Sequence, residues 1–298
     1  MASPQTGIFA LGTASHAYLE FDLAATSDPT SMVARVAGLR EPRTTIGGVN
    51  LVAGFRPELW SALAAGVPTD VTGFNEPLHG AEGYTMPATQ HDAVIWLTGA
   101  SYDVVFDLSG DVVDELAGQA ELVHEIVGFP YHHDLDLTGF IDGTENPTLV
   151  EATGIALVPA AAPGEGGSIL LLQQWEHDGT RWNQLSVEAK EAVIGRRKSD
   201  SAELDPLPPG SHVARTDQDR FGKILRRNIA YGTLRQHGTI FVGFSASQRS
   251  LAAMLESMIG ATGEPVDDLI RFAVPLTGAY YFVPSAEALS AFGEDRRA

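Results

Sequence analysis

The alternation of apolar and polar side chains predicts strands and amphipathic helices along the first half of the chain. Residues 17–24 alternate in this way, which is typical of a strand with one buried face. Residues 93–98 are continuously apolar, which predicts a fully buried strand. By the same criteria we expect strands over 47–52 and 122–128, and helices from Asp28-Pro29 onward, over 57–65 and over 103–116. The order is therefore strand, helix, strand, followed by strand, helix, strand.

That order is the split βαβ pattern of a ferredoxin-like domain, and the second half repeats it more loosely. Strands are expected over 168–175, 238–246 and 268–283, and helices over 186–197 and 247–259. Residues 158–167 contain Pro and Gly and predict a loop, whereas 199–223 form a long polar stretch of the kind that is usually functional or disordered. We predict an α+β protein with two antiparallel sheets and helices packed on their faces. The expected domains are 1–135 and 136–298.

Composition excludes several classes of protein. The 298 residues are 44% hydrophobic and 19% charged, as in globular proteins. They include no cysteine, which excludes disulfides, Cys-ligated zinc or iron–sulfur clusters, thiolate-ligated haem and a Cys nucleophile. The net charge of −19 opposes binding to nucleic acid or to an anionic membrane. The sequence contains no run of 18 or more apolar residues, so no transmembrane helix is expected. The first Arg is Arg35, so a basic leader is not expected and a cytoplasmic location is.

Polar residues concentrate at 131–147, where Asp142-Gly143 and Asn146-Pro147 indicate two turns. The side chains of His132, His133, Asp134 and Asp136 could supply a non-haem site of two histidines and one carboxylate. Adjacent residues on an extended chain point in opposite directions, however, so the two histidines would not share one metal. A solvated loop is the favoured interpretation of this cluster.

The segment 224–232 places two polar side chains on one face. If it is extended, Arg226 and Asn228 share a face and Arg227 takes the other. Such a pair could bind an anion or a peroxide, and an edge strand with solvated charges is the alternative. His212 follows Pro-Leu-Pro-Pro-Gly-Ser in the long polar stretch, and taken alone it is typical of a surface or capping residue.

Four ordered motifs together resemble the dye-decolorizing peroxidases, of the bacterial B-type. They are Phe-Ile-Asp-Gly-Thr-Glu-Asn-Pro (140–147), Gly-Ser-His-Val (210–213), Ile-Leu-Arg-Arg-Asn-Ile-Ala-Tyr-Gly (224–232) and Gly-Thr-Ile-Phe-Val-Gly-Phe-Ser-Ala (238–246). The N-terminal Pro-Gln-Thr-Gly-Ile-Phe-Ala and the C-terminal Thr-Gly-Ala-Tyr-Tyr-Phe-Val-Pro also fit, so the resemblance spans nearly the whole chain. One departure is Ile229-Ala230, which replaces the usual Met-Pro and would alter the wall of the haem pocket.

The resemblance implies two ferredoxin-like halves and one haem b per chain, held mainly by the C-terminal half. It implies a role for eight residues: His212 as proximal ligand of the haem iron, Asp267 as its hydrogen-bond partner, Asp142 as distal acid, Arg226 and Asn228 as distal arginine and amide, Arg196 at a haem propionate, and Gly143 and Thr144 as cofactor contacts. A carboxylate bonded to the ligating imidazole makes it a stronger donor. A distal carboxylate can relay the peroxide proton, and a distal arginine can stabilise the developing negative charge. Which of Asp142 and Arg226 dominates stays open.

The function implied is that of a haem peroxidase that uses hydrogen peroxide to oxidise dyes, phenolics or small redox mediators through a ferryl intermediate. One alternative is a haem-binding or porphyrin-handling protein with incidental peroxidase activity, and another is a non-haem metal enzyme that uses the cluster at 132–136. Trp175, Trp182 and Tyr231 are candidates for electron transfer by residue type, although a core role is favoured for each. Relatives form dimers and hexamers, so a homo-oligomer is expected. The chain ends soon after Pro284, so loading into an encapsulin shell is not expected.

Overall fold

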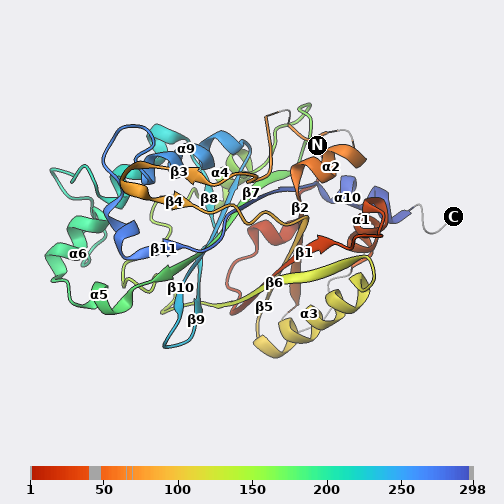
Figure 1. The fold of residues 1–298 in the computed structure, drawn as a ribbon, viewed down its shortest axis with the longest axis horizontal. Helices are drawn as coiled ribbons and strands as arrows, with labels where there is room; N and C mark the ends of the chain where they lie inside the picture. The colour runs from red at the N-terminus through yellow and green to blue at the C-terminus, as the bar shows by residue number, and fades with distance from the viewer. Residues whose placement is uncertain (1, 40–47, 65, 69, 295–298) are drawn as a thin grey trace.

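The computed structural model describes residues 2–39, 48–64, 66–68 and 70–294, and Figure 1 shows the chain traced through them. Gly47 and Ala65, the ends of one expected strand and one expected helix, lie outside the described residues, as do the last four residues on which the expectation about shell loading depends. Within the described part of the chain, no helix combines the length and the apolar character needed to cross a bilayer.

One antiparallel sheet of ten strands organises the described residues. Its order is β11-β7-β12-β2-β5-β1-β6-β9-β10-β8, and an additional pairing of β7 with β10 closes it into a ring. The strands are β1 (Ser15–Leu23), β2 (Val49–Phe55), β5 (Ala93–Gly99), β6 (Ala120–Phe129), β7 (Ser168–His177), β8 (Leu225–Arg226), β9 (Ile229–Gly232), β10 (His237–Ser245), β11 (Ala273–Pro275) and β12 (Ala279–Val283). A separate two-stranded sheet pairs β3 (Leu78–His79) with β4 (Thr85–Met86).

The expectation of two separate sheets is wrong, because strands from the two halves of the chain pair with each other. Phe282 of β12 pairs with Phe55 of β2, and Gly128 of β6 pairs with Tyr231 of β9. An unpaired edge strand exposes a row of backbone donors and acceptors, and these pairings satisfy them within one molecule.

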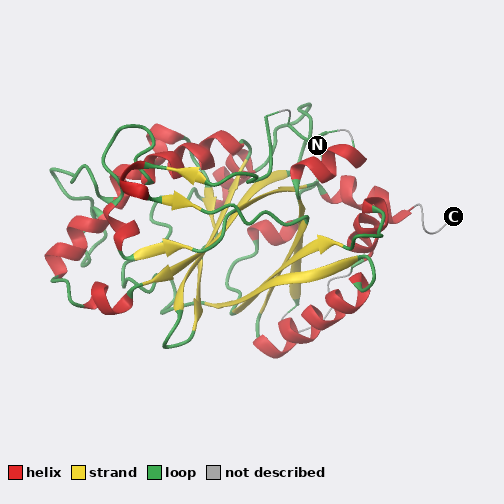
Figure 2. Cartoon of the chain, viewed as in Figure 1, coloured by secondary structure: helices red, strands yellow, loops and turns green. Residues whose placement is uncertain are grey.

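The helices begin and end at residues with clear local reasons. The Asp28 carboxylate accepts the backbone N–H groups of Thr30 and Ser31 at the start of α1 (Pro29–Gly38). The helix α6 (Val187–Ile194) ends early, because Gly195 adopts a left-handed conformation with φ 96°. The other helices are η1 (Thr6–Phe9), α2 (Pro57–Leu63), η2 (Ala81–Gly83), α3 (Tyr102–Leu116), α4 (Leu149–Ala156), α5 (Gly179–Asn183), α7 (His212–Arg215), α8 (Gln218–Phe221), α9 (Gln248–Met258), η3 (Asp268–Arg271) and α10 (Ala286–Glu294). The strands form the centre of the molecule, and α1, α3, α5, α6 and α10 lie outside them (Figures 1 and 2).

Two main apolar clusters fill the fold, one on each face of the ring of strands. Along β12, Tyr281 belongs to one cluster, whereas its neighbours Tyr280 and Phe282 belong to the other. This division follows from the period of two in a strand, which sends successive side chains to opposite faces. Helices α1, α3 and α10 gather at one end of the molecule and α9 lies toward the other, and all four pack on the cluster that contains Tyr280 and Phe282 (Figure 1). Trp182 of α5 and Ile194 of α6 belong to a third, small cluster with Phe140.

Most of the expected elements are confirmed, and three expectations are corrected. Residues 268–283 form η3, β11 and β12 rather than one strand. The long polar stretch contains α7 and α8, each only four residues long. The helix expected over 186–197 covers Val187–Ile194. The sequence patterns did not indicate α4, α5, α10 or the β3–β4 pair.

Candidate active site

A large cavity lies against β7 and β10, beneath α9 and beside α7. The empty space within it, including the part that is open to solvent, is about 1230 Å³. Much of its wall is apolar and comes from Leu171, Ile224, Phe241, Leu251, Met254, Leu255, Met258 and Ile270. The amphipathic spacing of α9 places Leu251, Met254 and Leu255 on the face that meets this cavity. A cavity of this kind suits a large, flat, mostly apolar ligand.

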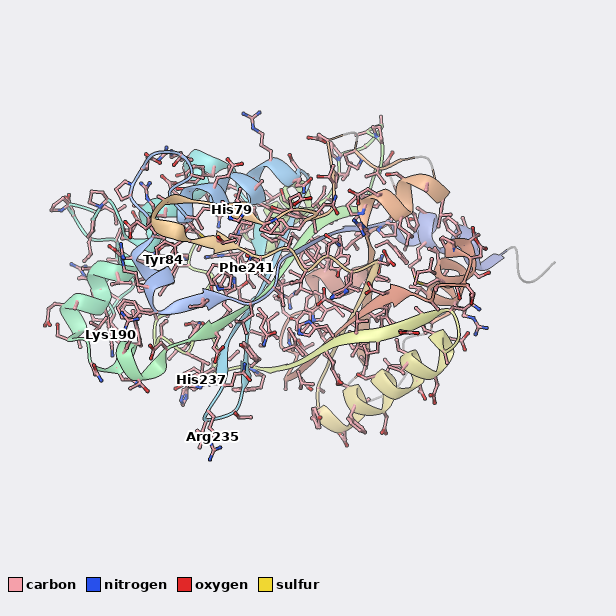
Figure 3. The ribbon with its side chains drawn as sticks, in the orientation of Figure 1. His79, Tyr84, Lys190, Arg235, His237 and Phe241 are labelled. Carbon is pink, nitrogen blue, oxygen red and sulfur yellow. The ribbon has the colours of Figure 1, made fainter. Side chains whose placement is uncertain are left out.

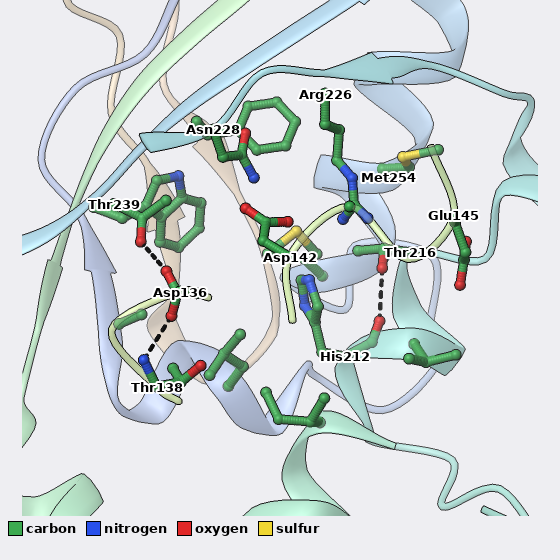
Figure 4. Close-up of a pocket in the computed structure, with 18 of the residues that line it drawn as sticks. Asp136, Thr138, Asp142, Glu145, His212, Thr216, Arg226, Asn228, Thr239 and Met254 are labelled. Carbon is green, nitrogen blue, oxygen red and sulfur yellow. Dashed lines mark hydrogen bonds between the residues drawn. The ribbon is translucent and has the colours of Figure 1, made fainter. Parts of the chain in front are cut away.

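Seven of the eight site residues implied by the resemblance line this cavity, and the eighth contacts one of them. The lining residues are Asp142, Gly143, Thr144, Arg196, His212, Arg226 and Asn228. Asp267 lies behind His212 and is completely buried. The close-up shows His212 on one side and Asp142, Arg226 and Asn228 on the other (Figure 4).

His212 is held in a defined orientation by Asp267. It is the first residue of α7, whose N-terminus is capped by Ser211, and its Nδ1 lies 2.7 Å from Asp267 Oδ2. A carboxylate accepts, so Nδ1 carries the proton and a neutral imidazole has its lone pair on Nε2. The other carboxylate oxygen of Asp267 accepts the Leu269 backbone N–H at 2.8 Å, which fixes the carboxylate in turn.

The environment of His212 shifts its titration in two opposing directions. Burial disfavours the imidazolium, but the charge and hydrogen bond of Asp267 outweigh it, so the pKa of His212 is raised above its ordinary value. The side chain remains 24% exposed because it faces the cavity. The imidazole is therefore accessible from the cavity and is supported from behind by a carboxylate.

The opposite wall is built by two segments that one asparagine joins. Asn146 donates from Nδ2 to the Arg226 carbonyl at 2.9 Å and accepts the Arg226 backbone N–H at 2.8 Å. This contact brings the turn that carries Asp142 against the start of β8. Gly143 has φ 75°, and a Cβ there would lie 2.9 Å from Asn146 Nδ2, so the turn requires glycine. Asn228 accepts the Val242 backbone N–H through Oδ1 at 3.0 Å, which leaves its amide nitrogen free to donate.

The guanidinium of Arg226 retains an unused donor. Its Nε is buried and has no hydrogen-bond partner among the described residues. A buried donor of this kind requires a partner, and an anionic or peroxidic ligand in the cavity would provide one. Arg227 occupies the other face, as the extended chain predicts: it donates to the Ile8 and Ala10 carbonyls and lies over the Trp96 ring.

Arg196 lies at the margin of the cavity and already has carboxylate partners. Its Nη2 is 2.9 Å from Glu145 and 2.7 Å from Glu203, and its Nη1 donates to the Ser201 carbonyl at 2.9 Å. Its Nε is buried without a partner in the described structure. A ligand carboxylate here would therefore share the guanidinium with Glu145 and Glu203.

The exposed side chains of His132, His133 and Asp134 agree with the solvated loop that the sequence favours. His132 and His133 have φ of 43° and 68°, so the chain turns there instead of extending, and both side chains are exposed. Across the described residues, no group of three or more His, Asp or Glu side chains is placed to hold a metal ion. Trp175, Trp182 and Tyr231 are all buried, and Trp175 lines the cavity.

One group of site residues was not predicted from the sequence. The Thr239 hydroxyl donates to Asp136, and His177 Nε2 lies 3.3 Å from the same hydroxyl oxygen. All three side chains line the cavity. Their positions depend on the register of β10 against β7, where Thr239 pairs with Trp175, and no local sequence signal indicates that register.

Comparison with known proteins finds relatives of a single family. The family model of the Dyp-type peroxidase C-terminal region matches residues 133–288. A dye-decolorizing peroxidase from Mycolicibacterium paratuberculosis is 35% identical over 272 residues, which cover 87% of this chain and 75% of the relative. One from Rhodococcus erythropolis is 34% identical over 279 residues, which cover 87% of this chain and 79% of the relative.

Solved structures are similar over almost the whole chain. The crystal structure of a dye-decolorizing peroxidase from Bacteroides thetaiotaomicron has a TM-score of 0.89 at 27% identity, covering 98% of this chain and 99% of that one. A DypB variant from Rhodococcus jostii RHA1 in complex with heme has a TM-score of 0.87 at 32% identity, covering 97% of this chain and 98% of that one.

Proposed function

The chain belongs to the Dyp-type peroxidase family, and we propose that it binds one haem b in the large cavity and uses hydrogen peroxide to oxidise dyes, phenolics or small redox mediators. The observation that carries this proposal is the arrangement of His212 across the cavity from Asp142 and Arg226. A related DypB variant was solved in complex with heme.

The residues of the cavity suit this cofactor. Haem is a flat apolar ring with two carboxylates, and the cavity offers apolar walls, an imidazole with a lone pair on Nε2 and unpartnered guanidinium donors on Arg196 and Arg226. We infer that His212 ligates the iron, that Arg196 faces a propionate, and that Gly143 and Thr144 contact the ring from the distal side. When bound, haem supplies the redox chemistry by which peroxide is reduced and an organic donor is oxidised.

On the distal side, the side chains of this chain move a proton and stabilise charge. The Asp142 carboxylate accepts the proton from the inner oxygen of hydrogen peroxide and returns it to the outer oxygen, which leaves as water. The Arg226 guanidinium is placed to stabilise negative charge on the departing oxygen. The free amide nitrogen of Asn228 can donate to the same oxygen.

We further propose that the fold consists of two ferredoxin-like halves, with a boundary between residues 135 and 136. The strand orders β6-β1-β5-β2 and β12-β7-β10-β9 support this, because each places the fourth strand beside the first and the third beside the second. The boundary falls in the segment between β6 and β7. The protein is also predicted to form a homo-oligomer, either a dimer or a hexamer. Its cytoplasmic location likewise stays a prediction.

The test is the visible spectrum of the haem-reconstituted protein before and after one equivalent of hydrogen peroxide. We expect a Soret band in the wild type that shifts on addition of peroxide, and loss of the ferric His-ligated features in His212→Ala. Arg226→Ala should slow the reaction with peroxide by about 10²–10³-fold, the effect of removing one preorganised donor. His79→Ala, an exposed histidine on β3, is the control and should match the wild type.

Two outcomes would overturn the proposal. A Soret band that peroxide only bleaches would indicate a haem-binding protein without peroxidase function. Absence of a Soret band would show that the cavity does not hold haem. Comparison of Asp142→Ala with Arg226→Ala decides which residue contributes more to the activation of peroxide.

A further inference from the structure

A second pocket adjoins the large cavity. The empty space within it, including the part that is open to solvent, is about 690 Å³, and it is lined by Tyr131, Trp182 and Phe272 together with His177 and His237. The two spaces share four lining residues: Thr138, His177, Leu269 and Ala273. Figure 3 shows His237 at the hairpin end of β10, away from Phe241 in the large cavity. The two spaces therefore adjoin along these four residues.

The hydrogen bonds around His177 determine which ring nitrogen is free. The Thr239 hydroxyl has one proton and donates it to the Asp136 carboxylate, so its oxygen can only accept from His177 Nε2, 3.3 Å away. Asp136 is fixed in turn, because it also accepts the Thr138 backbone N–H at 2.8 Å. A neutral His177 therefore carries its proton on Nε2 and its lone pair on Nδ1.

His177 is held in the form that can accept a proton. Burial lowers its pKa, the nearby Asp136 carboxylate raises it in part, and His237 lowers it further, so the net shift is downward. The imidazole is therefore neutral at neutral pH. The chain of Asp136, Thr239 and His177 resembles the arrangement in which a carboxylate orients a general base through an intervening group.

The second imidazole of the pocket is oriented in a similar way. His237 Nδ1 lies 3.1 Å from the Thr233 carbonyl, and a carbonyl can only accept, so Nδ1 carries the proton. A neutral His237 then has its lone pair on Nε2. A Cβ on Gly179 would lie 2.9 Å from that atom, so the absence of a side chain at 179 leaves space beside it.

We propose that this second pocket binds phenolic reductants and that His177 accepts the phenolic proton during their oxidation. The rings of Trp182 and Phe272 meet edge to face, with centroids 5.4 Å apart, and provide an aromatic surface for the phenol ring. The phenol loses one electron to the peroxide-oxidised cofactor in the adjoining cavity. Its O–H bond breaks, an N–H bond forms at His177 Nδ1, and the product is a neutral phenoxyl radical.

This inference rests on the proposed peroxidase function, and a pair of reductants separates the two. Guaiacol loses a proton on oxidation, whereas ABTS is oxidised by one electron without releasing a proton. In His177→Gln we expect the ratio of kcat/KM for guaiacol to that for ABTS to fall by about 10²-fold, the lower end of the range for loss of a general base. His79→Gln, outside both cavities, is the control and should keep the wild-type ratio.

The relay through Thr239 gives a variant pair that tests positioning without removing the imidazole. Thr239→Val removes the hydroxyl that joins Asp136 to His177, and it should lower the guaiacol-to-ABTS ratio mainly through kcat. Thr239→Ser retains the hydroxyl and should restore the ratio. A purely structural role for this residue would lower the rates with both reductants together in Thr239→Val, and that result would overturn the proposal.

Binding is measured separately, by isothermal titration calorimetry of guaiacol into the resting holoenzyme without peroxide. Gly179→Val fills the pocket beside His237 and should weaken binding at least about fivefold, whereas His177→Gln should change it little. Guaiacol binding unaffected by Gly179→Val, or an unchanged guaiacol-to-ABTS ratio in His177→Gln, would overturn the second-pocket inference. Absence of ABTS oxidation by the wild type would instead overturn the proposed function itself.

Discussion

At the scale of single residues, the orientation of His212 depends on one buried carboxylate. Asp267 is completely buried, and its two oxygens bind His212 Nδ1 and the Leu269 backbone N–H. Asp267→Asn keeps the shape of the side chain but removes the charge that strengthens the imidazole donor. We expect the reaction of the haem-loaded enzyme with peroxide to slow by about 10–100-fold, a typical cost of losing the partner of a metal ligand. Stopped-flow absorbance at the Soret band measures this rate.

The adjacent residue supplies the matched control for this prediction. Asp268 is partly exposed, with 42% of its side chain accessible, and it pairs with Arg271 rather than with His212. Asp268→Asn removes the same charge within one residue of the site, and its reaction with peroxide should remain within about twofold of the wild type, as expected for exposed charges. Equal effects of the two substitutions would show that net charge, rather than the bond to His212, determines the rate.

Single residues also show what sequence can and cannot indicate about the site. The shared face of Arg226 and Asn228 follows from the period of two in an extended chain, and the structure confirms it. The proximity of His212 to Asp142 does not follow from any local pattern, since 70 positions separate them and their elements meet only through the fold. Only the family resemblance implied that pairing.

At the scale of elements, length determines which segments the pattern predicts. The eleven residues of α9 complete three turns, so the apolar spacing is visible in the sequence. The helices α7 and α8 contain four residues each, which is too short for a period to appear. The most important element of the site, α7 with His212, is therefore one that hydrophobic patterning could not predict.

One buried carboxylate, that of Glu20, joins three strands of the ring through two hydrogen bonds. Glu20 of β1 is buried, and it accepts from the Tyr281 hydroxyl of β12 at 2.5 Å and binds His124 Nδ1 of β6 at 2.7 Å. The hydrogen bond to Glu20 raises the pKa of His124 above its ordinary value, against the opposing effect of burial. His124→Gln should lower the free energy of unfolding by about 1.5–3 kcal/mol at pH 6, the range for a hydrogen bond to a charged group.

The pH dependence of that loss has a defined sign. A raised pKa in the folded state means that His124 contributes its full stabilisation below the unfolded-state pKa and loses it as pH rises through the folded-state value. The difference between the wild type and His124→Gln should therefore be larger at pH 6 than at pH 9 in denaturant unfolding. Tyr281→Phe, which removes the other donor to Glu20, should destabilise equally at both pH values. A difference for His124→Gln that does not change with pH would contradict this assignment.

At the scale of the whole molecule, closure of the sheet joins the two halves of the chain. The sequence predicts the strands, but closure depends on pairings such as Phe55 with Phe282, which lie near opposite ends of the chain. Each half, considered alone, predicts a sheet with two free edges. The expectation of two sheets was wrong for this reason: hydrophobic patterns report which face of a strand is buried, not which strand lies beside it.

Gly54 provides a test of that closure, because β2 meets β12 there. A Cβ at this position would lie 2.9 Å from Tyr281 Cβ and 3.1 Å from Val94 Cγ1, so Gly54→Ala forces the two strands apart. We expect the free energy of unfolding to fall by about 1–3 kcal/mol, as for other overpacked cores. Gly110, in the middle of α3, has nothing within 4 Å of its added Cβ, so Gly110→Ala should instead stabilise by about 0.5–1 kcal/mol.

The shape of the unfolding transition decides whether the ring behaves as one unit. Tryptophans lie in both halves, Trp96 on β5 and Trp175 on β7, so intrinsic fluorescence and helical circular dichroism together follow the whole molecule. If the ring is one cooperative structure, Gly54→Ala moves both signals to lower denaturant by the same amount. If the halves are independent, strain at the joint is released by opening the joint without unfolding either half, and Gly54→Ala leaves both signals where they are in the wild type.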